Sequence, residues 1–183
     1  MVKTHKSVEK SRVTISQLML PSHTNFSGKI HGGYILSLMD QIAFACASKH
    51  SKNYTVTASV DTVDFLNPIE VGELVVMKAS VNYVGRTSMI IGIRVESENI
   101  HTGIKKHCNS SYFTMVAKND AGESVEVPGL ILDSEIEIRR FIKSLRRVQT
   151  KVNRRNEFMD SEFEAKNFME ELKNYNVTIS YKP

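Results

Sequence analysis

Residues 32–49 constrain the fold of this 183-residue chain more than any other segment, because apolar side chains occur there on nearly every side of a predicted helix. A helix that is apolar all round is typical of a buried helix. The rest of the chain must therefore supply a layer that covers it. The apolar members of this run are Ile35, Leu36, Leu38, Met39, Ile42, Ala43, Phe44, Ala45, Cys46 and Ala47.

Strand-like stretches lie on both sides of the predicted helix. Alternating or β-branched residues indicate strands at 12–19, 54–65, 74–84, 87–96 and 106–118. We expect the last four to follow one another in hairpin succession, because turn residues separate them. One antiparallel sheet wrapped around one long helix buries both apolar surfaces in a single core, so the predicted architecture is α+β. The polar residues 1–10 are expected to fray.

The composition changes after Pro128 and Gly129. Apolar residues recur at helical spacing in two later segments, 133–152 and 157–175, which we predict to be helices. Residues 176–181 could form a short terminal strand. We therefore predict a first domain of residues 1–130 and an amphipathic helical extension of residues 131–183.

The segment from Arg139 to Arg155 holds eight Lys or Arg residues and no acidic residue. One interpretation is a patch that binds a polyanion such as nucleic acid. The other, which we favour, is a helix whose apolar stripe packs on the protein while its basic face stays in water. That stripe consists of Ile138, Phe141, Ile142, Leu145 and Val148.

Composition excludes several classes of protein. With 41% hydrophobic and 24% charged residues, the chain is globular and not disordered. No apolar run approaches the ~20 residues of a membrane span, and the first residues lack the apolar core of a secretory signal. Cys46 and Cys108 cannot form a disulfide framework, and no Cys/His spacing suits zinc. We expect a cytoplasmic protein with free thiols, without a metal, and with neither nucleic acid nor a membrane as its partner.

Asp40 is the most informative polar residue, because it lies in the middle of the apolar helix. No basic residue stands one helical turn away on either side. One interpretation is a carboxylate in a half-dry cleft that acts as a general base or a nucleophile. The other is an aspartate on a wet stripe of the helix, or one held by a distant Arg or Lys. The residues alone favour neither.

His31, Gly32 and Gly33 stand where the helix begins. Backbone N–H groups at a helix N-terminus suit an oxyanion, although a glycine pair also serves a tight turn. Gly33 and Asp40 are seven residues apart, or ~10 Å along a helix. One helix cannot easily place both on one small carbonyl, so a shared site would draw them from two chains of a dimer.

Two loops carry further polar candidates. Asn25 could hold a carbonyl or orient a water, although a turn-forming role is commoner for such an asparagine. Arg86, Thr87 and Ser88 lie in a predicted turn between two strands. Their side chains could bind phosphate, or they could simply form a polar hairpin turn.

Four stretches together resemble the hot-dog fold acyl-CoA thioesterases, and within them the cytosolic acyl-CoA hydrolases. These stretches are PSHTNFSG at 21–28, HGGYILSLMD at 31–40, VDTVDFLNPI at 60–69 and YVGRTSM at 83–89. The resemblance covers residues 11–130 and is specific because several motifs occur in the same order. It does not extend to residues 131–183. His31 stands where many bacterial members have an aromatic residue.

The resemblance implies a role for each candidate. Asp40 matches the catalytic acid position, and Asn25 matches a second catalytic residue that the partner subunit contributes. Gly32 and Gly33 match the turn whose N–H polarises the thioester carbonyl, with His31 beside them at the substrate. Arg86, Thr87 and Ser88 match a stretch that lines the coenzyme A tunnel. The family also implies dimers, commonly three dimers in a hexamer.

The sequence therefore predicts an acyl-CoA thioesterase that needs no cofactor, since coenzyme A is part of its substrate and product. The alternative is a non-catalytic acyl-CoA sensor whose basic helix contacts nucleic acid. The presence of both Asn25 and Asp40 argues against it. A different hot-dog enzyme, such as a hydratase, is disfavoured because its His–Asp motif is not found.

Overall fold

The structure, a computed structural model, describes residues 4–159, 164, 166 and 169–180. Contacts divide the chain into two compact units, residues 1–145 and residues 146–183. All the candidate site residues belong to the first unit. The predicted division into a domain of residues 1–130 and an extension of residues 131–183 stays a prediction.

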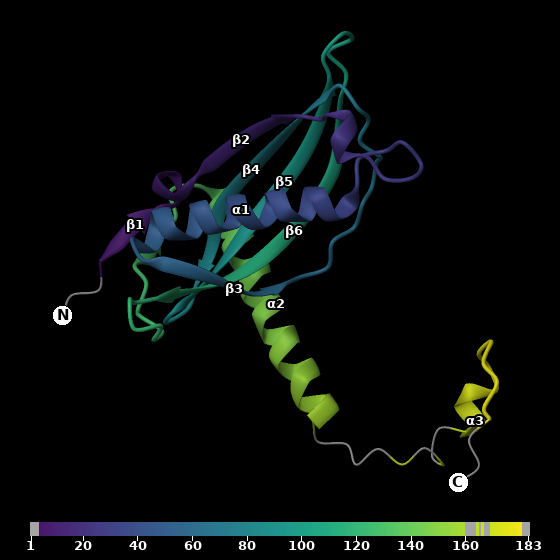
Figure 1. Ribbon diagram of the computed structural model, residues 1–183. Coiled ribbons are helices and arrows are strands. Elements are labelled where there is room, and N and C mark those ends of the chain that lie inside the picture. The colour runs from purple at the N-terminus through teal and green to yellow at the C-terminus, as the bar shows by residue number, and fades with distance from the viewer. Residues whose placement is uncertain (1–3, 160–163, 165, 167–168, 181–183) are drawn as a thin grey trace. The chain divides into compact units, whose positions relative to one another are not determined.

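A curved five-stranded antiparallel sheet forms the first unit (Figure 1). Its strands are β2 (Val13–Leu18), β3 (Tyr54–Val60), β4 (Glu73–Val84), β5 (Ser88–Asn99) and β6 (Lys105–Lys118), in the spatial order β2-β4-β5-β6-β3. The predicted α+β architecture, with a sheet wrapped around a long helix, is confirmed. The five predicted strands are present, although β3 ends at Val60 and not at Phe65.

The expected hairpin succession is wrong for one strand. β3 pairs with β6, so the chain crosses from one edge of the sheet to its interior between β3 and β4. Residues 61–72 make this crossing, and they contain Asn67-Pro68 and Val71-Gly72. Pro68 has no backbone N–H to donate to a neighbouring strand, and Gly72 has a φ of +83°. Residues 61–72 therefore do not continue β3, although the alternation in the sequence predicted a strand as far as Phe65.

Helix α1 (Gly32–Ser51) lies across the concave face of the sheet (Figure 1). Its side chains Ile35, Met39, Ile42 and Cys46 are at most 1% exposed and pack into the core. The opposite side is open in the single chain, so the expectation of a helix buried all round is wrong. The sheet covers only one side of the helix, and the exposed stripe contains Gly33, Ser37, Asp40, Gln41 and Phe44.

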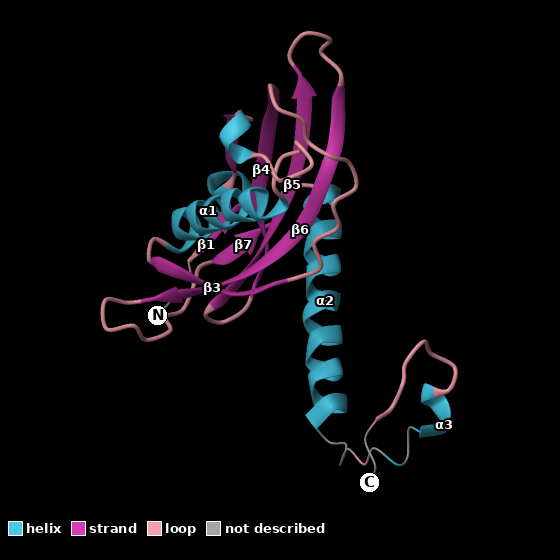
Figure 2. Cartoon of the chain, turned by 45° about the vertical axis from the view of Figure 1, so that its right-hand side comes forward, coloured by secondary structure: helices cyan, strands magenta, loops and turns pink. Residues whose placement is uncertain are grey.

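Residues 5–11 are held by pairing and burial, which corrects the expectation that residues 1–10 fray for all but residues 1–3, which lie outside the described residues. Strand β1 (His5–Ser7) pairs in parallel with β7 (Gly129–Ile131), and the two lie side by side in Figure 2. A short 3-10 helix, η1 (Val8–Ser11), follows β1 and buries Val8 and Ser11. A second short 3-10 helix, η2 (Pro21–His23), opens the loop before α1. Polarity alone did not show that β7 would supply a partner.

Helix α2 (Glu135–Met159) contains the basic stretch, and the short helix α3 (Met169–Leu172) lies in the second unit. In the first unit, the ring of Phe141 lies 5.2 Å from that of Tyr83, so the start of α2 packs on the sheet as expected. Ile138 and Ile142 stay 49% and 41% exposed, so the apolar stripe is only partly covered. Much of the predicted helix 157–175 lies outside the described residues, and residues 176–180 form no strand.

His50, near the end of α1, gives the fold a pH dependence. It is 1% exposed, and its Nε2 lies 3.0 Å from the carbonyl oxygen of Pro128. Burial lowers the pKa of His50 below its ordinary value of 6.5, although the hydrogen bond to Pro128 opposes this. A lowered pKa means that the unfolded chain binds the proton more readily. The stabilisation by neutral His50 is therefore complete above pH 6.5 and is lost as the pH falls below it.

We expect the melting temperature to fall as the pH is lowered from 6.5, partly because of His50. Thermal unfolding measured across this range should be less pH-dependent in His50→Gln than in the wild type. His101→Gln is the matched control, because His101 is exposed in the β5–β6 hairpin. If His50→Gln keeps the full wild-type slope, another group carries the effect.

Candidate active site

Asp40 and Thr57 form the central polar pair of the site. Asp40 lies on the exposed stripe of α1, and Thr57 lies on the edge strand β3. The Thr57 hydroxyl donates a 2.6 Å hydrogen bond to Oδ1 of Asp40. None of the described Lys or Arg residues forms an ion pair with Asp40, so the carboxylate is held by a neutral donor. In the single chain it faces solvent, which is the wet-stripe arrangement that the residues alone left open.

Thr57 was missed by reasoning from the sequence. It stands in an alternating strand where hydroxyl residues are ordinary, and nothing in its spacing connects it with Asp40. Only the position of its strand in the chain could have indicated that Thr57 lies near Asp40. A short polar strand following directly after the helix must return alongside that helix, and its hydroxyls then face the exposed stripe.

The start of α1 is capped by His31. Its Nδ1 accepts a 2.9 Å hydrogen bond from the backbone N–H of Gly33, so this N–H is already occupied in the single chain. The Gly32 N–H has no hydrogen-bond partner in the described part of the chain. A Cβ on Gly32 would lie 3.1 Å from the ring of Phe65, so glycine lets this half-exposed ring sit against the helix start.

Asn25 organises the loop that leads to α1. Its Oδ1 accepts hydrogen bonds from the Ser27 hydroxyl at 2.7 Å, from the Ser27 N–H at 3.0 Å and from the Lys29 N–H at 3.2 Å. The turn-forming role of this side chain is therefore present. Its Nδ2 has no partner among the described residues, so the amide donor remains available to a ligand.

Arg86, Thr87 and Ser88 lie far from Asn25 and from the start of α1 within one chain, but only two strands from Thr57, because Thr57 pairs with Met115 and Met115 pairs with Met89. Their turn joins β4 to β5, and its backbone is fixed by bonds from the Val127 N–H to Arg86 O and from the Ala117 N–H to Thr87 O, both 3.0 Å. The 12-residue strand β5 separates this turn from the sheet end near the loop before α1, a span of about 36 Å. One chain thus brings Asp40 to Thr57 and His31 to Gly33, and it places the Arg86 turn two strands from Thr57 but a strand length from His31 and Gly33.

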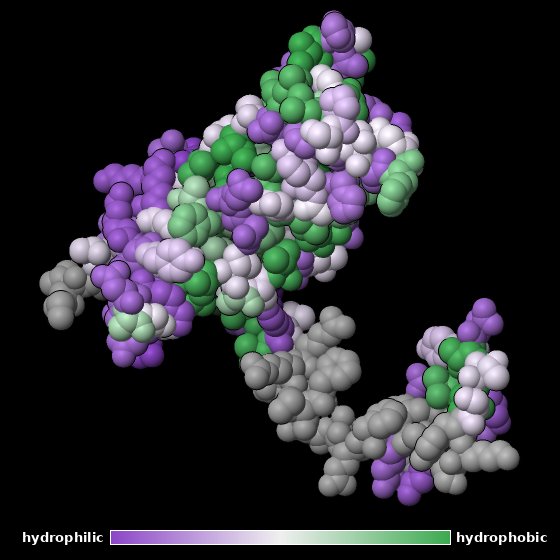
Figure 3. All heavy atoms as spheres, viewed as in Figure 1, coloured by the Kyte–Doolittle hydropathy of each residue, from purple (hydrophilic) through white to green (hydrophobic). Residues whose placement is uncertain are grey.

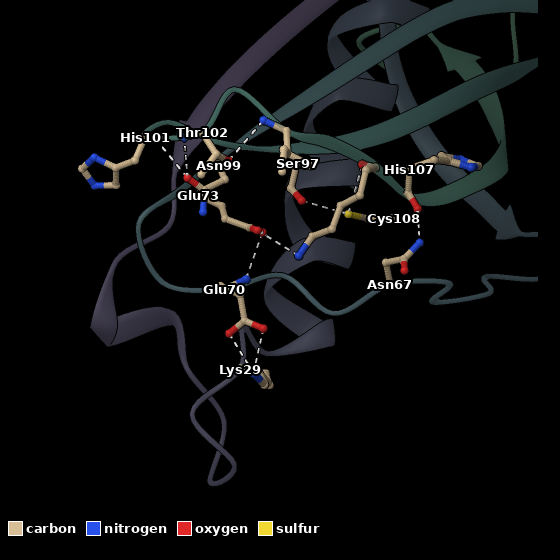
Figure 4. A network of polar contacts seen from close by, with 12 residues as sticks. Lys29, Asn67, Glu70, Glu73, Ser97, Asn99, His101, Thr102, His107 and Cys108 are labelled. Carbon is tan, nitrogen blue, oxygen red and sulfur yellow. Dashed lines mark hydrogen bonds and ion pairs between the residues drawn. The ribbon is translucent and has the colours of Figure 1, made fainter.

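A network of polar contacts fixes the crossing segment that carries Phe65 (Figure 4). Lys106 Nζ lies 2.9 Å from Glu73 Oε1, and the Glu70 N–H donates to Glu73 at 3.1 Å. Asn67 Nδ2 donates to the carbonyl oxygen of His107 at 2.9 Å. Burial opposes ionisation of Glu73, but the hydrogen bonds from Lys106 and from the Glu70 backbone outweigh it and lower the pKa. The network therefore ties this segment to β6.

The remaining reactive groups do not form a second catalytic cluster. Burial raises the pKa of the Cys46 thiol to about 12, so it is a core thiol, as expected. Cys108 is 1% exposed and donates to the Ser97 hydroxyl. Among the residues described, no group of three or more His, Cys, Asp or Glu side chains is placed to hold a metal ion.

Comparison with known proteins connects this geometry with a family. Residues 27–104 match the model of the thioesterase superfamily. Protein VdlD of Helicobacter pylori is 42% identical over 79% of this chain and 82% of its own. An uncharacterized acyl-CoA thioester hydrolase, YkhA of Bacillus subtilis, is 33% identical over 80% of this chain and 86% of its own. A hexameric acyl-CoA thioesterase structure superposes with a TM-score of 0.80 at 36% identity, covering 82% of this chain and 97% of that one.

A cytosolic acyl coenzyme A thioester hydrolase of Rattus norvegicus is 31% identical over 74% of this chain. This chain spans only 36% of the length of that protein.

An acyl-CoA hydrolase of Staphylococcus aureus allows a residue-level comparison. Its complex with butyryl coenzyme A, coenzyme A and coenzyme A disulfide has a TM-score of 0.78 at 30% identity, covering 92% of this chain and 99% of that one. Alanine variants of that protein replace an asparagine, an aspartate and a threonine that are separated by 15 and 17 residues. Asn25, Asp40 and Thr57 have the same two separations.

Proposed function

The chain belongs to the thioesterase superfamily and has its hot-dog fold, and from this premise we propose that it hydrolyses acyl-CoA to a free carboxylic acid and coenzyme A. The names of its relatives support a hydrolase and give no support to the alternative of a non-catalytic sensor. Coenzyme A enters as part of the substrate and leaves as product, and we propose that no separate cofactor is required.

The Asp40–Thr57 pair is the observation that carries this proposal. An unpaired carboxylate held by a short hydroxyl bond suits a base or a nucleophile, because the hydroxyl fixes its direction without the charge of a cation. Asp40 and Thr57 are separated by 17 residues, as are the aspartate and the threonine that were replaced by alanine in the Staphylococcus aureus hydrolase. The test is a series of acyl-CoAs from acetyl to palmitoyl, with release of free thiol followed over time. If none is hydrolysed faster than in buffer, the proposed reaction is wrong.

The chemistry can be written with the residues present. Asp40 takes a proton from a water that attacks the thioester carbon, or its carboxylate attacks directly and water then cleaves the anhydride. Negative charge on the carbonyl oxygen is held by N–H groups at the start of α1. The carbon–sulfur bond then breaks, and coenzyme A leaves as a thiolate. The Gly32 N–H is open to this role, whereas the Gly33 N–H becomes available only when His31 turns away.

Two chains are proposed to complete each site. Strand β3 is an edge strand, so it has backbone N–H and C=O groups available for pairing. Phe44, Tyr54 and Val60 are 40%, 64% and 45% exposed near the same edge. Figure 3, viewed from the side of α1, shows green apolar surface interrupting the polar surface of this face. Pairing there would cover Asp40 and bring it towards Asn25 of the partner subunit.

The turn of Arg86, Thr87 and Ser88 is the remaining group of candidate residues. In the described part of their own chain Arg86, Thr87 and Ser88 make no hydrogen bond or ion pair with Asp40, and we propose that they line the path of coenzyme A in the assembled protein. Hexameric thioesterases among the solved structures support a homo-oligomer. We propose three dimers as its arrangement, with His31 and this turn contacting substrate.

The proposed setting is the cytoplasm, with acyl-CoA as the partner and without nucleic acid or a membrane. The helices in the described part of the chain include none that is long and apolar enough to cross a bilayer.

Thr57 is expected to act on turnover through Asp40. Thr57→Val removes the hydroxyl but keeps the shape, and we expect kcat to fall about 10- to 100-fold, the range of a lost hydrogen bond to a charged group. Thr57→Ser should restore most of the activity because it restores the donor. Steady-state kinetics with the best acyl-CoA of the series measures both. If Thr57→Val keeps the wild-type kcat, the hydroxyl has no role in turnover and this prediction is wrong.

A further inference from the structure

A polar groove lies on the convex face of the sheet, opposite α1. In β4 the residues Val75, Met77, Ala79 and Val81 face the core, so the alternate residues face outward. The groove crosses β2, β4, β5 and β6 beside the start of α2 and has a volume of about 380 Å³. This is within the lower range of small-molecule sites. None of the candidate catalytic residues lines it.

Four cationic side chains line the groove, and no carboxylate does. They are Arg12, Lys78, Arg94 and Arg140. Lys78 and Arg94 share one carboxylate, that of Glu96, at 3.1 and 2.9 Å. Two cations paired with one carboxylate leave a net positive charge. The hydrogen bonds from Arg94 and Lys78 lower the pKa of Glu96, so Glu96 stays ionised and paired with both cations at neutral pH.

The other two cations differ from each other. Arg12 is paired with Glu9 and with Glu137, which lies 2.9 Å away. Arg140, on the first part of α2, forms no ion pair with any residue that the structure describes. Its guanidinium therefore has all its donors free beside the groove.

Two buried polar side chains line the groove between these cations. Ser80 and Asn82 are 7% and 6% exposed, and the Ser80 hydroxyl donates to Oδ1 of Asn82 at 3.0 Å. Asn82 Nδ2 lies over Gly92, 2.1 Å from where a Cβ would stand, so glycine at 92 makes room for this amide. No described residue accepts a hydrogen bond from Nδ2. The side chain of Asn82 is buried, but its Nδ2 is open to the groove, and an amide donor without an acceptor among cations suits an anionic oxygen atom.

We propose that this groove binds a phosphorylated anion of the diphosphate class. Guanidinium groups bind phosphate oxygens in a fork, and Arg94 and Arg140 offer two such groups around the Asn82 amide. The groove is on the face of the sheet away from the Asp40–Thr57 pair, so the anion bound there is separate from the thioester carbonyl. A diphosphate group occurs in free nucleotides and in coenzyme A itself, and either could supply it.

The test is titration of the full-length native assembly with inorganic pyrophosphate by calorimetry at low salt. We expect saturable binding by the wild type and at least 5-fold weaker binding by Arg140→Gln. Arg139→Gln is the matched control, because Arg139 is the neighbouring exposed cation of the same helix and does not line the groove. Its affinity should stay within 2-fold of the wild type. Equal loss in both variants, or no binding by the wild type, overturns the proposal.

A second groove variant and the mass of the assembly separate loss of the binding site from loss of the assembly. Arg94→Gln should also weaken pyrophosphate binding, and the mass of the assembly should be unchanged in both groove variants. If Arg140→Gln instead dissociates the assembly while the wild type ignores pyrophosphate, the groove is a contact between copies and the proposal is wrong. Hydrolysis kinetics identify the source of the diphosphate. A raised KM for acyl-CoA in Arg140→Gln assigns it to coenzyme A, and an unchanged KM assigns it to a free diphosphate such as ADP.

Discussion

Asp40→Asn is expected to lower kcat on the order of 100-fold or more while coenzyme A still binds. The substitution keeps the size of the side chain and its acceptor oxygen for Thr57, but it removes the negative charge that takes a proton from water or attacks the thioester. Positioned acid–base catalysis contributes roughly 10²- to 10⁴-fold, so loss of the charge should be felt mainly in kcat. Thiol release at saturating acyl-CoA measures it.

The control for this prediction is Asp120→Asn. Asp120 is an exposed aspartate in the turn after β6, close to the last turns of α1 and eight residues of helix away from Asp40, so its loss should leave kcat unchanged. Asp40 is exposed in the single chain and makes no ion pair among the described residues, so Asp40→Asn should also keep the wild-type melting temperature. Retention of more than a tenth of the activity, a loss below ~1.4 kcal/mol in the barrier, would remove Asp40 from the reaction.

The sequence predicted the elements of the fold better than their connections. The apolar run at 32–49 and the alternating stretches carry strong periodic signals, and the structure places helix α1 and strands β2 to β6 there. Strand order is a non-local property, so the pairing of β3 with β6 could not be read from neighbouring turns. The same is true of β1, whose partner β7 is more than 120 residues away in the chain.

The candidate site was predictable in its residue types but not in its contacts. Asp40 could be singled out because a carboxylate in an apolar run is unusual, yet its exposure depends on how far the sheet curls around α1. His31 was noted only as a neighbour of the glycines, and its hydrogen bond to the Gly33 N–H depends on a side-chain rotamer. Thr57 became visible only when β3 was placed beside the exposed stripe of α1.

Mixing two inactive proteins is expected to restore activity. Asn25→Ala removes the amide in the loop before α1, and Asp40→Ala removes the carboxylate. Each protein alone should be inactive or nearly so. Gly33 and Asp40 are ~10 Å apart along α1, and Asn25 lies still further from Asp40 along the chain, before the helix begins. We therefore expect the two side chains to act on one thioester from different subunits.

The expected recovery follows from the symmetry of a dimer. After complete exchange of equal amounts, half of the dimers contain one chain of each kind. Each such dimer has one intact site and one doubly altered site, so about a quarter of the wild-type activity should return. Exchange itself is checked with a mass-tagged chain, and two separate preparations of Asp40→Ala mixed together serve as the control that must stay inactive. If exchange is complete and the mixture of the two variants also stays inactive, Asn25 and Asp40 act within one chain. The edge strand β3 would then have to be covered by something other than the second half of the active site.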